Sequence, residues 1–293
     1  MKTHQLPLYA MILPTAILFA IFIYLPMAGL IIGFRQYDIV SGYFGDGPLT
    51  FRFFVQFFQD PYFFRIIRNT VLLNAFMLAV AFPLPIIFAL MLNEVQHRRI
   101  KRLVQSVSYL PHFISTVVIV GLMVDMFSSK GLVNQIIYWA GFEKILFFQE
   151  PSWFRPLYVG SSVWEGLGWS AIIYFAALAG IDTELYEFAE VEGAGRFAKI
   201  WYITIPGLLP TITILFILAV GSIMSVGFEK VYLMSNPSTY ETSDVITTYV
   251  YRRGIIGMDY SYATAVGMFN SLVNFGLLMG ANTLTRKAGH GLW

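Results

Sequence analysis

Six long apolar stretches, separated by polar loops, dominate the pattern of the chain. A helix that crosses the bilayer needs about 20 predominantly apolar residues, and each stretch reaches about that length. The pattern therefore predicts an all-α, polytopic membrane protein with six transmembrane helices. Their predicted bounds are residues 8–34, 69–92, 107–127, 157–181, 208–228 and 260–284.

Prolines interrupt two of these stretches. Pro83 and Pro85 predict a kinked second helix, which a membrane tolerates where neighbouring groups satisfy the freed carbonyls. Pro111 and His112 interrupt the start of the third stretch. The first stretch is longer than the apolar core of a secretory signal, and no A-x-A cleavage site follows it, so we expect a retained helix.

Composition supports the membrane interpretation and excludes several other classes. Hydrophobic residues make up 57% of the 293 residues and charged residues only 12%, against roughly 25% charged residues in a soluble domain. One soluble core of this size cannot hide that much apolar surface. The net charge of +2 gives no basic field for nucleic acid, and the absence of cysteine excludes disulfides and thiolate chemistry.

Lysine and arginine residues predict the orientation of the spans, because cytoplasmic loops carry an excess of them. With six spans, three basic segments and the N-terminal lysine lie on one side, whereas the opposite loops mix basic with acidic residues. Both termini are therefore expected in the cytoplasm. The basic residues on that side are Lys2, Arg98, Arg99, Lys101, Arg102, Arg196, Lys199, Arg286 and Lys287.

The segment between the fourth and fifth predicted spans, residues 182–206, has the pattern of a short helix, a glycine elbow and a second short helix. Asp182 or Thr183 is a suitable N-cap. Gly193 and Gly195 can provide the left-handed stop, and Pro206 is expected to end the second helix before the next span.

The first of these short helices is predicted to be amphipathic. Leu185, Phe188, Ala189 and Glu192 follow the spacing i, i+3, i+4, i+7 of one helix face. A linker that lies on the membrane surface carries Lys and Arg on its polar face, but here the polar residues are mostly glutamates. The pattern therefore favours a helix that binds in a groove on another protein over a linker that lies on the membrane surface.

Residues of this segment match a long motif. Glu187, Ala189, Gly193, Ile203 and Pro206 fit the spacing of the EAA motif, E-A-A-x3-G-x9-I-x-L-P. Phe188 and Ile205 depart from it but keep its apolar character. The segment thus resembles the EAA loop of the membrane subunits of binding-protein-dependent ABC importers.

The resemblance covers the whole chain. Outside the loop, the sequence resembles permeases of the complex-polysaccharide branch of carbohydrate importers, and most specifically those of alginate-oligosaccharide importers. It implies one permease domain over residues 1–293, in which residues 182–206 form a coupling loop. The segments that carry the resemblance outside this loop are residues 108–115, 132–135, 244–254, 260–267 and 291–293.

The same resemblance implies partners and a location. The chain has no G-x4-G-K-[ST] loop, so ATP and Mg²⁺ would be used by a separate cytoplasmic ATPase in two copies. A second, different permease that forms a heterodimer with this chain is expected in the complex. An extracytoplasmic solute-binding protein and a saccharide substrate complete it, in a bacterial inner membrane. The coupling residues implied are Glu187, Phe188, Ala189, Glu192, Gly193, Ile203 and Pro206.

Polar and aromatic residues within the spans are candidates for the saccharide pathway. A carboxylate inside a membrane has a high free energy of insertion, so Glu165 is a candidate functional residue. It either lines the pathway or reaches a water-filled vestibule. Trp164 and Trp169 either stack on sugar rings or anchor at the interface, and Asn270 either faces the pathway or bonds a neighbouring helix. The segment 236–259 is expected to face outward toward the binding protein, or to form an interfacial helix.

Three other functional classes are alternatives: a membrane enzyme, a secondary active transporter, and a subunit with only an assembly or scaffold role. A membrane enzyme needs a clustered catalytic or metal site, whereas the four histidines are scattered and lack H-E-x-x-H spacing. We therefore expect no catalytic residue, no metal site and no cofactor in this chain. A secondary active transporter for a small polar solute is the main alternative, although only Glu165 and Asp125 resemble ion-coupling carboxylates and no matched halves are visible.

Overall fold

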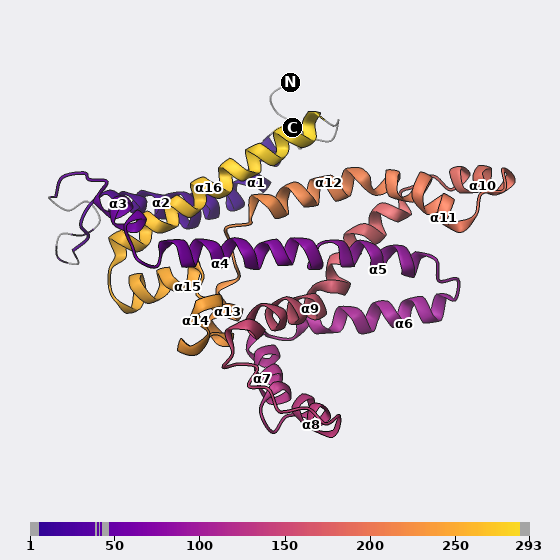
Figure 1. Cartoon of the computed structure of the whole chain (residues 1–293). Coiled ribbons are helices and arrows are strands. Elements are labelled where there is room, and N and C mark those ends of the chain that lie inside the picture. Colours follow the sequence, from indigo (N-terminus) through magenta and orange to yellow (C-terminus); the bar gives the residue numbers. More distant parts are fainter. Residues whose placement is uncertain (1–5, 39, 41, 43–46, 288–293) are drawn as a thin grey trace. The chain divides into compact units, whose positions relative to one another are not determined.

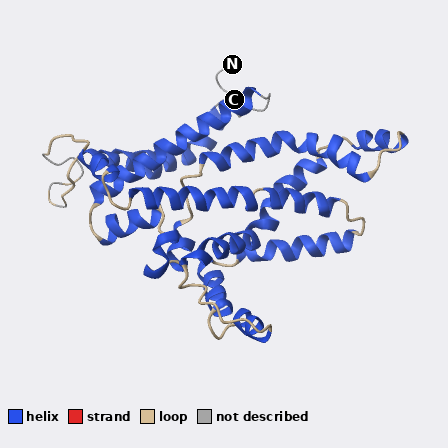
Figure 2. Ribbon diagram, viewed as in Figure 1, coloured by secondary structure: helices blue, strands red, loops and turns tan. Residues whose placement is uncertain are grey.

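The computed structural model describes residues 6–38, 40, 42 and 47–287. Within these ranges the chain is helical, and its one strand-like feature is an isolated bridge between Asp38 and Gly42 (Figure 2). The sequence-based assignments at Lys2 and at residues 291–293 lie outside the described residues. The all-α prediction is confirmed for the part of the chain that the structure describes.

Sixteen α-helices, joined in places by short 3₁₀ or π turns, form the described chain (Figure 1). They are α1 (Leu6–Phe19), α2 (Leu25–Met27), α3 (Arg52–Phe58), α4 (Phe63–Phe76), α5 (Pro83–Asn93), α6 (Arg98–Tyr109), α7 (Thr116–Phe127), α8 (Leu132–Trp139), α9 (Pro151–Ala179), α10 (Thr183–Val191), α11 (Arg196–Lys199), α12 (Ile205–Gly221), α13 (Phe228–Met234), α14 (Tyr240–Ser243), α15 (Ile246–Val250) and α16 (Tyr260–Lys287).

Six helical segments of the described chain are long and apolar enough to cross a membrane, as predicted. The second and fourth begin at Phe63 and Pro151 rather than at the predicted residues 69 and 157. Charged side chains near these starts obscured the helices in the sequence pattern. The six segments are Tyr9–Phe34, Phe63–Asn93, Thr116–Trp139, Pro151–Ala179, Arg196–Gly221 and Tyr260–Arg286.

The predicted bounds of the third and fifth spans are wrong. The third does not run over residues 107–127, because a 3₁₀ turn at Leu110–Phe113 separates α6 from α7, and Ser115 caps α7 by accepting a bond from the Val118 N–H. The fifth does not run over residues 208–228. Its helix already starts at Arg196 and ends at Gly221.

Three spans carry a π turn at the same place relative to a proline. Ala20–Tyr24 precedes Pro26, Met77–Ala81 precedes Pro83, and Ile200–Thr204 precedes Pro206. In each case the residue before the proline donates its N–H to the carbonyl five residues back. Because proline lacks an N–H and its ring crowds the carbonyl four residues back, the wider turn lets the helix continue. Pro206 therefore does not end the second short helix, contrary to the prediction.

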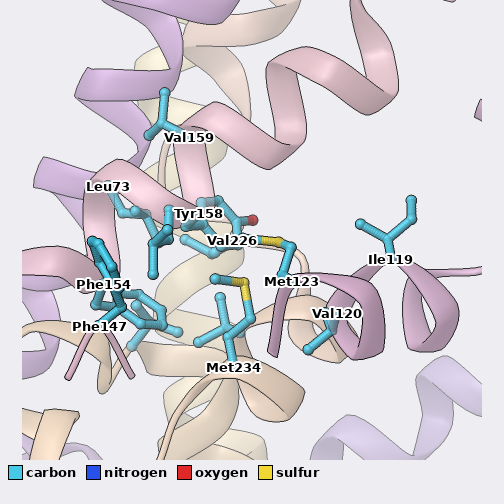
Figure 3. Close-up of a cluster of buried hydrophobic side chains, with 13 residues drawn as sticks. Leu73, Ile119, Val120, Met123, Phe147, Phe154, Tyr158, Val159, Val226 and Met234 are labelled. Carbon is cyan, nitrogen blue, oxygen red and sulfur yellow. The ribbon is translucent and has the colours of Figure 1, made fainter. Parts of the chain in front are cut away.

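The described helices group into two compact units, and the prediction of a single permease domain stays a prediction. The larger unit comprises residues 64–248 and 273–293. Its main apolar cluster joins α4, α7, α9 and α13, with Leu73, Met123, Tyr158 and Met234 at its centre (Figure 3). A second cluster packs Ala89 of α5 against α9 and α12. Helix α9 contributes residues to both clusters and is therefore the central element of this unit.

The smaller unit comprises residues 1–63 and 249–272, and aromatic side chains form much of its core. Phe57 of α3 is fully buried and lies edge-on to Phe269, with ring centroids 5.3 Å apart. Gly33 permits a close helix crossing, since a Cβ there would come within 3.3 Å of the Ala265 backbone nitrogen.

Candidate functional site

The predicted helix–elbow–helix forms within the larger unit as α10 and α11 (Figure 1). Asp182, one of the two predicted caps, accepts a 3.0 Å hydrogen bond from the Glu184 N–H through Oδ1. The carboxylate of Glu184 in the first turn also suits the positive end of the helix dipole. The start of α10 is therefore fixed by its own side chains.

Gly193 ends α10 in a Schellman motif. The Ala194 N–H donates to the Ala189 carbonyl at 2.8 Å, and the Gly193 N–H donates to the Glu190 carbonyl at 3.0 Å. Gly193 has φ +77°, a conformation that favours glycine. The prediction that Gly195 also adopts a left-handed stop is wrong, since its φ is −72° and its backbone is extended.

Two side-chain contacts hold the helices of the elbow together. Lys199 Nζ lies 2.9 Å from Glu190 Oε2, and this hydrogen bond lowers the pKa of the exposed Glu190 carboxyl. The hydroxyls of Tyr186 and Thr204 lie 2.9 Å apart. Because Thr204 belongs to the π turn that leads into α12, the orientation of α10 is tied to the fifth span.

The elbow presents large apolar side chains that nothing in the described chain covers. Phe188 is 69% exposed, and Leu185, Val191 and Phe197 are exposed as well. These four residues, termed the elbow patch, lie at and beyond the motif positions that the sequence singled out. Glu187 and Glu192 are exposed, Ala189 is half-buried, and Ile203 and Pro206 belong to the fifth span. Several large apolar side chains exposed on one short segment are typical of an interaction site.

Glu165 has a partner that sequence reasoning missed. Lys230 Nζ of α13 lies 2.9 Å from Glu165 Oε2 and 3.0 Å from Ser162 Oγ, both on α9. The lysine side chain is only 7% exposed, and burial lowers the pKa of Lys230 although Glu165 opposes that shift. The pair joins two helices and neutralises both charges where either alone would be costly.

A cavity of about 430 Å³ opens beside this pair. Tyr158, Ser162 and Glu165 of α9 line it, together with Lys230. The lysine retains N–H capacity, and Glu165 Oε1 accepts no hydrogen bond within the described chain. The cavity therefore offers both a donor and an acceptor, which is the requirement for binding a hydroxyl group.

The other pathway candidates of the larger unit, Trp164 and Trp169, do not line this cavity. Trp164 lines apolar hollows on another side of α9, and Trp169 stacks on His112 with ring centroids 4.4 Å apart. Asn270 belongs to the smaller unit, where its side-chain oxygen is buried and accepts no hydrogen bond from the described residues. The pathway roles of these residues stay predictions.

Two other asparagines, Asn74 and Asn274, join separate elements of the larger unit. Asn74 donates to the Ile223 carbonyl at 2.7 Å, and Asn274 accepts from the Met224 N–H at 3.0 Å. These bonds satisfy backbone groups just beyond the end of α12, where hydrogen bonds within the helix no longer reach them. They explain how the fifth span can end at Gly221.

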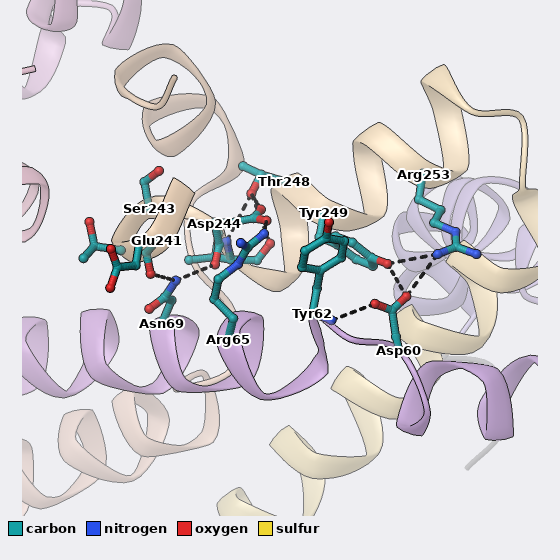
Figure 4. Close-up of polar contacts among 12 residues, drawn as sticks. Asp60, Tyr62, Arg65, Asn69, Glu241, Ser243, Asp244, Thr248, Tyr249 and Arg253 are labelled. Carbon is teal, nitrogen blue, oxygen red and sulfur yellow. Dashed lines mark hydrogen bonds and ion pairs between the residues drawn. The ribbon is translucent and has the colours of Figure 1, made fainter. Parts of the chain in front are cut away.

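Several residues of the segment 236–259 make polar contacts within this chain, and the expectation that the segment faces outward toward the binding protein stays a prediction. In the smaller unit, Tyr249 donates a hydrogen bond to Asp60 Oδ2, and Arg253 Nη1 lies 3.0 Å from the same oxygen (Figure 4). Tyr262 also donates to this oxygen. Burial opposes ionisation of Asp60, but these bonds and the Tyr62 N–H outweigh it and lower the pKa of Asp60.

A second polar network lies within the larger unit, and Figure 4 shows its contacts as well. Asn69 donates to the carbonyls of Glu241 and Asp244 at 2.9 and 3.1 Å. Arg65 pairs with Asp244 at 3.0 Å, and Thr248 donates to the same carboxylate at 3.3 Å. Thr248 is buried. This network fastens the segment before α15 to the start of the second span.

Comparison with known proteins shows the family to which the chain belongs. The model of the family described as "Binding-protein-dependent transport system inner membrane component" matches residues 81–284. The polygalacturonan/rhamnogalacturonan transport system permease protein YteP of Bacillus subtilis (strain 168) is 42% identical, over 98% of this chain and 89% of that protein.

Two solved structures are also similar. One is a crystal structure of a bacterial ABC transporter involved in the import of the acidic polysaccharide alginate, at 44% identity and TM-score 0.89, over 97% of this chain and 96% of that chain. The other is a bacterial alginate ABC transporter in complex with an alginate pentasaccharide-bound periplasmic protein, at 43% identity and TM-score 0.91, over 98% and 96%.

These relatives are importer permeases, which argues against the secondary-transporter alternative. With six membrane-spanning helices in its described part, the chain is a multi-pass membrane protein. It belongs to the family of binding-protein-dependent transport system inner membrane components, the permease subunits of ABC importers.

Proposed function

We propose that this chain is one of two permease subunits of an ATP-driven importer for acidic oligo- or polysaccharides. A solute-binding protein delivers the saccharide from outside the inner membrane, and two copies of a cytoplasmic ATPase use ATP and Mg²⁺. The second permease is a different polypeptide, and both termini of this chain lie in the cytoplasm. The acidic substrate class is suggested by the polygalacturonan and alginate transporters among its relatives.

The elbow patch is the observation that carries this proposal. Its exposed apolar side chains fit a cleft on a soluble protein, and the acidic polar face of α10 does not suit an anionic membrane surface. The patch lies on the EAA-like segment between the fourth and fifth spans. The ATPase is therefore the partner that we assign to it.

The geometry of the elbow suggests how force is transmitted. The Schellman motif and the Tyr186–Thr204 contact make α10 a short rigid lever on the fifth span. When two ATPases close on ATP, they draw their bound elbows together. The spans then rock between an inward-open and an outward-open arrangement, since a helix transmits a displacement applied at its end.

The cavity beside Glu165 and Lys230 is the proposed site of saccharide contact in this subunit. Its donor and acceptor pair suits hydroxyl groups, which neutral and acidic sugars share. Weak contacts of this kind suit a translocation pathway, because a substrate must leave as readily as it enters.

Crosslinking tests the coupling role directly. The chain has no cysteine, so Phe188→Cys places a single thiol on this subunit. In the assembled importer we expect a bifunctional maleimide to join this thiol to the ATPase. Phe142→Cys is the matched control, because Phe142 is 70% exposed but lies outside the elbow. Crosslinks from both positions, or from neither, would contradict the proposal.

Transport measurements test the pathway role. Glu165→Gln should lower saccharide uptake at least about fivefold, since the neutral amide no longer pairs with Lys230. Glu143→Gln changes an exposed acidic residue and serves as the control. Equal uptake by the wild type and Glu165→Gln would remove Glu165 from the pathway while leaving the coupling role intact.

A further inference from the structure

Helix α6 combines a basic end with an apolar remainder. Four of its first five residues are Arg98, Arg99, Lys101 and Arg102, and none of them makes an ion pair within the described chain. The second span ends at Asn93, so these cations lie only a few residues beyond a membrane-spanning helix. Their charges are therefore held close to a membrane surface.

The apolar face of α6 is not the face that packs on this chain. Ser108 turns toward α9, where its carbonyl would meet a Cβ added at Gly168. Ile100, Leu103 and Val107 share another face of the helix and are 51%, 64% and 62% exposed. In a membrane protein such a face is covered either by lipid or by another subunit.

A groove of about 400 Å³ follows this face from the basic end of the helix. Leu103, Val104 and Val107 form one wall, and Trp164 and Leu167 of α9 form the other. Trp164 and Glu165 are neighbours in sequence and so point about 100° apart on the helix. The groove therefore lies on a different side of α9 from the cavity beside Lys230.

We propose that this groove and its basic end form a binding site for an anionic phospholipid. The headgroup phosphate meets Arg99 and Lys101, which flank the apolar face one turn before Leu103 and Val104, and an acyl chain lies between α6 and α9. Charge complementarity favours this occupant over an apolar helix of another subunit, which would leave four cations without counter-charges. Free phosphate leaves the apolar groove unfilled.

Lipid retention by the purified importer tests the site without relying on transport. The complex in detergent is incubated with equal amounts of phosphatidylglycerol and phosphatidylcholine of identical acyl chains, and native mass spectrometry counts the lipids retained. We expect about tenfold more phosphatidylglycerol. Arg99→Gln with Lys101→Gln should abolish most of this preference, because each cation near a membrane contributes about fivefold.

Three comparisons make the result decisive. Lys130→Gln with Lys144→Gln removes two exposed charges away from α6 and should leave the preference unchanged. Val107→Trp fills the groove and should lower retention of both lipids. Excess inorganic phosphate should not displace the lipid. Absence of a preference in the wild type, an equal loss in the control pair, unchanged retention in Val107→Trp, or displacement by phosphate would overturn the proposal.

Discussion

Two lysine–glutamate pairs in the larger unit have the same 2.9 Å distance between nitrogen and oxygen but different surroundings. In the elbow, the side chain of Glu190 is 78% exposed, so water competes for both partners. Beside the cavity, the side chain of Lys230 is 7% exposed and that of Glu165 is 24% exposed. Distance alone therefore does not tell what an ion pair contributes.

The difference matches the tasks of the two regions. An exposed pair contributes at most about 1 kcal/mol and can break and form again at little expense, which suits a lever that meets a partner. A buried pair is hard to break, because the remaining charge would be left without compensation. The cavity wall is therefore rigid, whereas the elbow depends on its backbone for its shape.

Removing one charge of the buried pair should have the largest effect. Lys230→Met leaves Glu165 unpaired, and we expect the free energy of unfolding to fall by about 2–4 kcal/mol. Thermal unfolding of the purified complex measures this loss. Lys230→Met combined with Glu165→Met should recover most of it, because no charge then remains in place. A double variant as unstable as the single one would show that the pair acts through packing.

Asp60 sharpens the comparison, since it is a buried carboxylate with several donors. Asp60→Asn removes the charge that Tyr249, Tyr262 and Arg253 share, and it should cost about 2 kcal/mol. Its pKa is lowered in the folded state. The stability that the carboxylate contributes is therefore complete above its ordinary value of 3.8 and is lost as the pH falls further.

Unfolding followed between pH 6 and pH 3 provides the check for Asp60. The wild type should lose its advantage over Asp60→Asn at the acid end of this range. A constant difference between the two proteins would mean that Asp60 is not ionised in the folded state.

Gly193 tests whether the backbone sets the shape of the elbow. Gly193→Ala should strain the Schellman motif by about 1–2 kcal/mol, because φ is +77° there, although a Cβ would meet no neighbour within 4 Å. We expect reduced coupling of ATP hydrolysis to uptake. Gly195→Ala is the control, as that residue has φ −72° and equally open surroundings. Similar losses in both variants would point to a general effect on the loop.

The exposed pair should give the smallest effect. Glu190→Gln removes the partner of Lys199 and should leave thermal unfolding of the purified complex nearly unchanged. Any effect should shrink further at high salt, because exposed charges are screened. A loss as large as that of Lys230→Met would contradict the distinction between the two pairs.

The number of spans and the position of the elbow could be predicted from sequence, because both rest on local patterns. Six apolar stretches and the residues from Asp182 to Gly193 specify them without any tertiary contact. The helix starts at Phe63 and Pro151 could not be found in this way. Arginines close to them obscure the apolar pattern, and their acceptors, such as Asp244 for Arg65, lie far away in sequence.

The partner of Glu165 escaped prediction for the same reason. Lys230 lies beyond the predicted fifth span and 65 positions from Glu165, and no periodicity links the two. The available signal was the presence of Lys230, next to Glu229, in the otherwise apolar run after Gly227. The continuation of the helix through Pro206 was also missed, because a π turn leaves no distinct mark in the sequence.

That π turn has a consequence for the direction in which the elbow points. A turn that takes in one additional residue rotates everything beyond it by about 100° relative to a regular helix. The residues from Ile200 to Thr204 therefore set the rotation of α11 relative to α12. Deleting a single residue from this turn would rotate Phe188 around the helix axis, while α12 kept its packing against neighbouring helices.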